Sequence, residues 1–157
     1  MAVGEAKKEM QKTLDWIMPY LPEEKPRHLL GVGEVDDIFA ICERGIDTFD
    51  CVMPTRLGRM GQGLTNVKSQ MTNNKFRMDI TKARYANDVN PLEKDCGCFT
   101  CQNFSRAYLN HLFRVRELLG YRLLTIHNLY FLNHLVEEIR EAIEQNQLLE
   151  LRKKWLI

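Results

Sequence analysis

The chain has 157 residues, of which 45% are hydrophobic and 27% charged, and its formal net charge is +1. This composition is typical of a water-soluble globular protein, and the charge argues against a strongly basic nucleic-acid binder. No apolar run approaches the length that spans a membrane. Five cysteines and no recognisable secretory signal lead us to expect reduced thiols and a cytoplasmic location.

The first predicted element is a helix over residues 5–18. Met10, Leu14 and Ile17 recur there at helical spacing among lysine and glutamate residues, and Pro19 follows as a stop signal. The helix therefore has one apolar face that a sheet or another helix must cover.

Two short strands and a helix are predicted next. Residues 28–33 indicate a buried strand that ends in a glycine turn, and residues 48–53 indicate a second one that ends at a proline. Between them residues 34–44 predict a helix, with Asp36 and Asp37 in its first turn, where they favour its dipole. This alternation predicts an α/β fold in which the two strands are parallel and the helix packs across them.

Residues 61–90 are irregular and polar, and we expect small strands or hairpins there, for example over 76–80. The stretch of residues 56–84 is locally basic, with only Asp79 as an opposing charge. Its seven basic residues are Arg56, Arg59, Lys68, Lys75, Arg77, Lys82 and Arg84. A run of charge is most often a solvated face, so it indicates little by itself.

Two longer helices are predicted in the last third of the chain. The first covers residues 104–119 and is closed by Gly120. The second covers residues 128–145, with Asn128 as its N-cap. His127 would then lie at a helix start.

Three cysteines lie within six residues, at Cys96, Cys98 and Cys101, and His127 follows about one helix later. Three thiolates and one imidazole are a complete tetrahedral set for a structural Zn²⁺, with no position left for a substrate. We therefore predict one structural zinc ion per chain.

Other interpretations of these residues are open. His111 and His134 are alternatives to His127 as the fourth ligand, because spacing alone does not separate them. The cysteines could instead be small core residues or form a disulfide. An odd number of cysteines and the lack of a secretory signal argue against the disulfide.

Six runs of the sequence form a distinctive set of motifs. They are residues 2–5 (AVGE), 25–33 (KPRHLLGVG), 45–56 (GIDTFDCVMPTR), 98–101 (CFTC), 105–109 (SRAYL) and 125–129 (TIHNL). These runs, which together span nearly the whole chain, closely resemble those of the tRNA-guanine transglycosylases. Members of that family exchange guanine at the wobble position of tRNA for a 7-deazaguanine on the way to queuosine.

The resemblance implies the C-terminal part of a (β/α)8 TIM barrel, with a zinc-binding subdomain inserted after the last barrel strand. Residues 1–60 would be the last βα units, residues 61–127 the zinc subdomain and residues 128–157 a C-terminal helix. Residues 63–81 are longer than in the family, and a loop tolerates such an insertion. Because a barrel needs about 250 residues, and the family's general acid/base aspartate has no counterpart here, we expect the chain to be inactive alone.

The resemblance also assigns a catalytic role to Asp50. The matching aspartate in the family is the nucleophile that attacks C1′ of the ribose and forms a covalent intermediate. Asp50 follows an apolar strand, where barrel enzymes place catalytic groups. Without the resemblance, a buried aspartate that is paired with an amide or an arginine is the alternative.

Further site residues come from the same comparison of motifs. Val3, Glu5 and Leu30 match residues at the base pocket, and Val3 is typical of bacterial members, which favours pre-queuosine-1 as the incoming base. Two segments match the tRNA-contacting loops of the family. Their residues are Gly31, Val32, Gly33, Glu34, Val35, Asp36 and Asp37 in the first, and Thr55, Arg56, Leu57, Gly58 and Arg59 in the second.

The resemblance implies three kinds of partner, which are a tRNA with guanosine at its wobble position, a 7-deazaguanine base and a second copy of the chain in a homodimer. It thus implies a pentosyltransferase that modifies tRNA. Two other functions are open. One is a non-catalytic, zinc-stabilised module for tRNA binding or dimerisation, and the other is a zinc-stabilised scaffold with no RNA role.

Overall fold

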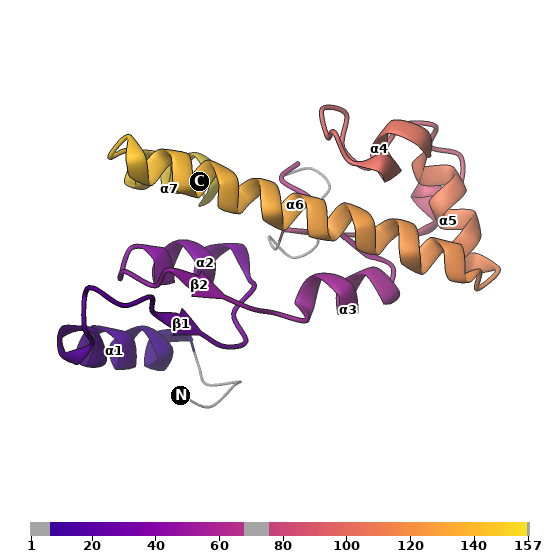
Figure 1. The fold of residues 1–157 in the computed structure, drawn as a ribbon. Coiled ribbons are helices and arrows are strands. Elements are labelled where there is room, and N and C mark those ends of the chain that lie inside the picture. Colours follow the sequence, from indigo (N-terminus) through magenta and orange to yellow (C-terminus); the bar gives the residue numbers. More distant parts are fainter. Residues whose placement is uncertain (1–6, 68–75, 157) are drawn as a thin grey trace. The chain divides into compact units, whose positions relative to one another are not determined.

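The computed structural model describes residues 7–67 and 76–156 (Figure 1). Their structure is mixed α/β and mostly helical, and it divides into two compact units. One unit contains the residues up to Met53 together with those from Ile139 onward, and the other is Pro54–Glu138. None of the described helices is long and apolar enough to cross a membrane.

The first unit contains a parallel pair of strands with helices around it (Figure 1). The predicted parallel pairing is confirmed, since His28 is in register with Thr48 and Leu29 with Phe49. Both strands are shorter than predicted. The elements are α1 (Lys7–Ile17), η1 (Met18–Tyr20), β1 (His28–Leu29), α2 (Val35–Cys42), β2 (Thr48–Phe49) and α7 (Leu148–Leu156).

Apolar side chains from α1, β1 and α2 form the core of this unit. Leu14, Leu29 and Ile41 lie in it and are at most 8% exposed. The helix predicted between the strands therefore packs as expected. The described residues form two two-stranded sheets, so the barrel expected from the resemblance is not seen in this structure.

The second unit contains an antiparallel hairpin and several helices. The hairpin pairs Gly63 with Met78, in the segment where small strands were predicted. The elements of the second unit are α3 (Met53–Arg59), β3 (Gln62–Leu64), β4 (Arg77–Asp79), η3 (Ala83–Tyr85), α4 (Phe99–Asn103), α5 (Arg106–Arg114) and α6 (Leu118–Glu144), the last of which continues beyond the unit.

Helix α3 was not predicted, because the sequence indicates a strand up to Met53 and a loop after Pro54. A proline is tolerated in the first turn of a helix, where its missing N–H has no partner to lose. The helix lies very close to α6, and a Cβ built at Gly58 would be 2.5 Å from Thr125 Oγ1 and 2.9 Å from its Cα. Gly58 is thus required by packing.

The prediction of one helix over residues 104–119 is wrong. Helix α5 ends at Arg114, the chain turns at Arg116 with a φ of 59°, and α6 begins at Leu118. Gly120 lies inside α6 and does not end a helix. A Cβ at Gly120 would be 3.0 Å from a side chain of α5, so this glycine permits the close approach of the two helices.

The prediction of a helix start at Asn128 is also wrong. Helix α6 has 27 residues, and Asn128 lies near its middle. The predicted boundary between residues 127 and 128 falls inside this helix. Beyond α6 the chain turns at Asn146, whose φ is 56°, and a further helix, α7, follows.

Replacing Gly58 by alanine should destabilise the chain by about 1–3 kcal/mol, because the added methyl group overlaps the backbone of Thr125 and forces α3 away from α6. Denaturant unfolding of purified protein measures the loss. The matched control is Arg59→Ala, on the exposed side of the same helix. Equal stability of Gly58→Ala and the control would contradict the close packing.

Candidate functional site

The three cysteines and the histidine of the predicted metal site come together in the second unit. Nδ1 of His127 lies 3.8 Å from Sγ of Cys96, 3.5 Å from Sγ of Cys98 and 3.4 Å from Sγ of Cys101. Tetrahedral zinc, with Zn–S near 2.3 Å and Zn–N near 2.0 Å, requires nitrogen–sulfur distances of about 3.5 Å. The buried cluster therefore fits a structural zinc ion, as predicted.

The orientation of His127 also suits a metal ligand. Its Nε2 lies 2.7 Å from the carbonyl oxygen of Leu64, so this nitrogen donates the ring proton. In the neutral imidazole Nδ1 is then unprotonated, and it faces the three sulfurs. A carbonyl partner of this kind fixes the tautomer and orientation of a metal-binding imidazole.

The other two histidines are not part of the cluster. His111 is exposed, and His134 lies beside Glu137 and Glu138 on α6. The open choice of the fourth ligand is thereby settled in favour of His127. Among the described residues no other group of three or more histidine, cysteine or acidic side chains is close enough to hold a metal.

Contacts among the four side chains shift their pKa values. Hydrogen bonds from the thiols of Cys101 and Cys96 lower the pKa of Cys98, whereas the contacts of Cys101 with Cys96 and Cys98 raise the pKa of Cys101. Burial of His127 opposes protonation, but the sulfurs of Cys96 and Cys98 raise its pKa to about 10. A metal bound by these four groups would replace the protons that they share.

Local structure holds the cysteine segment in place. Sγ of Cys98 caps α4 by accepting a hydrogen bond from the backbone N–H of Cys101, at 3.3 Å. The hydroxyl of Thr100 donates to the carbonyl of Leu123 on α6. A Cβ at Gly97 would lie 2.7 Å from the hydroxyl of Tyr130, so the loop runs directly over α6.

The predicted nucleophile lies in the first unit, at the carboxyl end of β2. Oδ1 of Asp50 accepts a hydrogen bond from the backbone N–H of Gly31, at 3.0 Å, and Gly31 has a φ of 78°. Nε2 of His28 lies 3.9 Å from the same oxygen. The side chain of Asp50 is 64% exposed, so the alternative of a buried aspartate is wrong, although its pairing with a backbone amide is observed.

His28 was not predicted to be near the nucleophile. It lies on β1 opposite Thr48, and its Nδ1 is 2.8 Å from the hydroxyl of that residue. Neighbouring parallel strands bring their carboxyl ends together, so the pairing of β1 with β2 was the available signal.

Most residues of the segment from Gly31 to Asp37 are buried within the first unit. Val32, Gly33, Val35 and Asp37 are buried, whereas Gly31 and Asp36 are exposed. A Cβ at Gly33 would lie 2.6 Å from Sγ of Cys51, which explains the glycine by packing.

Two carboxylates of this segment are paired with a lysine. Lys7 lies 2.7 Å from Oδ1 of Asp36 and 3.2 Å from Oδ2 of Asp37. Burial raises the pKa of Asp37, although the contact with Lys7 opposes this shift. Both acidic residues therefore help to attach α1 to α2.

The second predicted RNA-contacting segment forms α3. Its Leu57 and Gly58 are buried, Thr55 is half-buried, and Arg56 and Arg59 are exposed three residues apart. Residues at this spacing share one face of a helix. The two arginines are thus the members of the segment whose side chains can reach a partner.

The predicted base-binding residues are only partly covered by the structure. Leu30 is described and is 66% exposed. Val3 and Glu5 lie outside the described residues, as do Lys68 and Lys75 of the basic segment.

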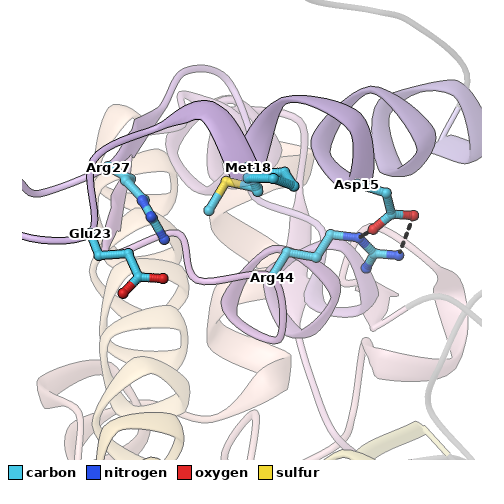
Figure 2. A pocket seen from close by; sticks show the side chains of 6 residues that line it. Asp15, Met18, Glu23, Arg27 and Arg44 are labelled. Atoms are coloured by element: carbon cyan, nitrogen blue, oxygen red, sulfur yellow. Dashed lines mark hydrogen bonds and ion pairs between the residues drawn. The ribbon is translucent and has the colours of Figure 1, made fainter.

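The first unit also contains an open pocket of about 340 Å³ (Figure 2). Arg27, which directly precedes β1, lines it near Glu23 and Met18. Arg44 and Asp15 form an ion pair at 2.7 Å along its wall. Neither Asp50 nor Gly31 lines this pocket, so it is separate from the predicted nucleophile.

Known proteins match the chain along its whole length. A family model described as queuine tRNA-ribosyltransferase matches residues 1–157. The queuine tRNA-ribosyltransferases of Pelotomaculum thermopropionicum and Thermoanaerobacter pseudethanolicus are each 48% identical to it over 99% of the chain. That of Streptococcus mutans is 46% identical over the same share. The chain spans 39–40% of the length of these relatives.

Purified protein should contain one zinc ion per chain, and Cys98→Ser should lose it. Without the metal the loop should separate from α6, because binding of such a metal is coupled to folding. Elemental analysis and thermal unfolding measure both effects. Cys42→Ser, which removes a cysteine of α2, is the control and should keep the metal. A folded, metal-free parent chain would contradict the assignment.

Proposed function

Because the chain belongs to the queuine tRNA-ribosyltransferase family, we propose that it supplies the nucleophile and an RNA-reading helix of a tRNA-guanine transglycosylase. This pentosyltransferase would exchange guanine at the wobble position of tRNA for a 7-deazaguanine, pre-queuosine-1. The observation that carries the proposal is the position of Asp50, which is exposed at the carboxyl end of a parallel strand and held by the N–H of Gly31.

Asp50 would act through covalent catalysis. Its carboxylate attacks C1′ of the ribose, the bond from C1′ to guanine breaks, and guanine leaves with the bonding electrons. The incoming base then attacks C1′ and releases Asp50. Two inversions retain the configuration at C1′, as in retaining glycosidases. The hydrogen bond from Gly31 orients the carboxylate for attack.

The fold and the position of Asp50 support a barrel origin for the first unit. We propose that β1 and β2 are successive strands of a (β/α)8 barrel, joined by α2, because barrel enzymes carry their active sites at the carboxyl ends of such strands. Leu30 is exposed at the same end, directly after β1, and would stack against the bound base, with Val3 and Glu5 completing this part of the pocket. We expect exchange only together with the remaining parts of such a barrel.

Recognition of tRNA would depend on the exposed arginines of α3. Arg56 and Arg59 can bind phosphates or the edges of unpaired bases. The wobble guanosine must leave its stack to reach Asp50, so an unpaired anticodon loop should be preferred to duplex RNA. In the first segment, only Gly31, Glu34 and Asp36 are accessible enough to touch RNA.

The surface next to the metal cluster supports a homodimer. Phe99 and Tyr108 are 58% and 38% exposed, and both rings contact Phe104, at centroid distances of 5.8 and 5.2 Å. Exposed aromatic groups of this kind are enriched in the cores of protein interfaces. We propose that this aromatic cluster lies in the contact between two copies of the chain.

Asp50→Asn should bind tRNA within about twofold of the parent but lose exchange by at least about a thousandfold, because an amide is a poor nucleophile. The assay joins this chain to the N-terminal portion of a relative and follows labelled guanine into tRNA. Asp47→Asn, three residues earlier on the same segment, is the control and should retain exchange. If Asp50→Asn exchanges like the parent, Asp50 is not the nucleophile. A joined protein that binds tRNA without a covalent adduct would favour the non-catalytic module.

Tyr108→Ala should shift the chain from dimer to monomer, because it removes one ring of the aromatic cluster. Sedimentation velocity over a range of protein concentrations measures the change. Tyr20→Ala removes a more exposed aromatic side chain from η1 and should leave the dimer intact. A parent chain that stays monomeric at the highest concentration would count against a dimer.

A further inference from the structure

We propose that Asn128 positions the RNA-reading helix α3 and couples it to the metal centre through Leu64. The inference rests on the proposed function only in assigning α3 to RNA. The coupling itself follows from hydrogen bonds inside the second unit. Asn128 is a positioning residue, because its side chain is completely buried and contacts only the protein.

The amide of Asn128 joins three elements. Its Oδ1 accepts a hydrogen bond from the backbone N–H of Leu64 at 2.7 Å. Its Nδ2 donates to the carbonyl of Pro54, in the first turn of α3, and to that of Gln62 on β3, both at 2.9 Å. One side chain of α6 thus holds both α3 and β3, and both of its N–H groups are used.

The partners of Asn128 belong to the edge of β3 that does not face β4. The carbonyl of Gly61 and the N–H of Thr65 bond to the β4 side of the hairpin. On the other edge, Asn128 binds Gln62 and the N–H of Leu64, and His127 binds the carbonyl of Leu64. Two consecutive residues of α6 therefore satisfy a strand edge that would otherwise have unpaired polar groups.

We call the hydrogen bonds of the Asn128 amide to Leu64, Pro54 and Gln62 the clamp. Leu64 connects the metal centre to this clamp. Its carbonyl accepts from Nε2 of His127, whose Nδ1 faces the sulfurs, and its N–H donates to Asn128. A displacement of His127 must therefore move Leu64, and with it the partner of Asn128. The close contact between Gly58 and Thr125 attaches the same helix at a second point.

The clamp matters for recognition because Arg56 and Arg59 project from the helix that it holds. Arginine side chains on a fixed helix lose less conformational freedom when they bind than those on a mobile segment. If α3 is loosened, both arginines should contribute less to the affinity for RNA. A metal that stabilises His127 would in this way influence RNA binding at a distance.

Asn128→Asp tests the clamp directly. An aspartate keeps the size of the side chain and the acceptor for Leu64, but it removes the two donors to Pro54 and Gln62. Hydrogen–deuterium exchange of residues 53–60 in the zinc-loaded chain should become at least about tenfold faster. The matched control is Asn110→Asp, because Asn110 is equally buried and donates to the carbonyls of Ile80 and Lys82, away from α3.

The affinity for an RNA anticodon stem–loop with guanosine at the wobble position provides the second measurement. Asn128→Asp should weaken binding by about tenfold and Asn110→Asp by less than about twofold. The effect of Arg56→Ala should be smaller in the Asn128→Asp background than in the parent, because the arginine is no longer held. A purely structural role for Asn128 would leave the two effects independent.

Removal of zinc from the parent chain with a chelator tests the link through Leu64 without any substitution. Exchange of residues 53–60 should then rise together with that of the cysteine loop. If α3 keeps its protection, the link to the metal centre is rejected. If Asn128→Asp does not hold zinc, Asn128→Ser, which keeps one donor, replaces it in the same comparison.

The outcomes separate this inference from the proposed function. Equal exchange of residues 53–60 in Asn128→Asp and Asn110→Asp would overturn the clamp, whatever the RNA data. Equal weakening of RNA binding by both variants would overturn its role in recognition. Faster exchange only in Asn128→Asp, with a parent chain that binds no RNA, would support the clamp and contradict the assignment of α3 to RNA.

Discussion

The second unit depends on the convergence of three sulfurs and one imidazole on a single point. Cys96, Cys98 and Cys101 come from one loop and the start of α4, whereas His127 comes from the middle of α6. The same cysteines belong to the hydrophobic core that contains Leu109 of α5. Bonds from these residues to a metal and the apolar packing of the core would therefore stabilise the same arrangement.

Features that depend on residues close together in the sequence could be predicted from it. The spacing of the cysteines indicated the metal site, and the alternation of apolar runs with helix signals indicated the parallel strands β1 and β2. The choice of His127 over His111 needed the structure, because the spacing in the sequence does not separate the two. Long-range folding brings only the first of them to the sulfurs.

The predicted helix boundaries were wrong where a residue makes tertiary contacts and does not cap a helix. Gly120 and Asn128 are ordinary signals for a helix end and a helix start. Here Gly120 permits contact between α5 and α6, and Asn128 bonds to α3 and β3. Gly58 was likewise predicted to contact RNA, but the close approach of Thr125 explains why a glycine is needed at this position. No local pattern distinguishes these uses from capping, so they become visible only in the folded chain.

The placement of Thr125, His127 and Asn128 on one continuous helix gives α6 a fixed rotational phase. Each residue of an α-helix advances the side-chain direction by about 100°. A single insertion or deletion between Gly120 and Thr125 would turn all three away from their partners at once, although every residue type was kept. The helix should therefore accept many substitutions and almost no change in length, and natural variation in length should collect in the loops.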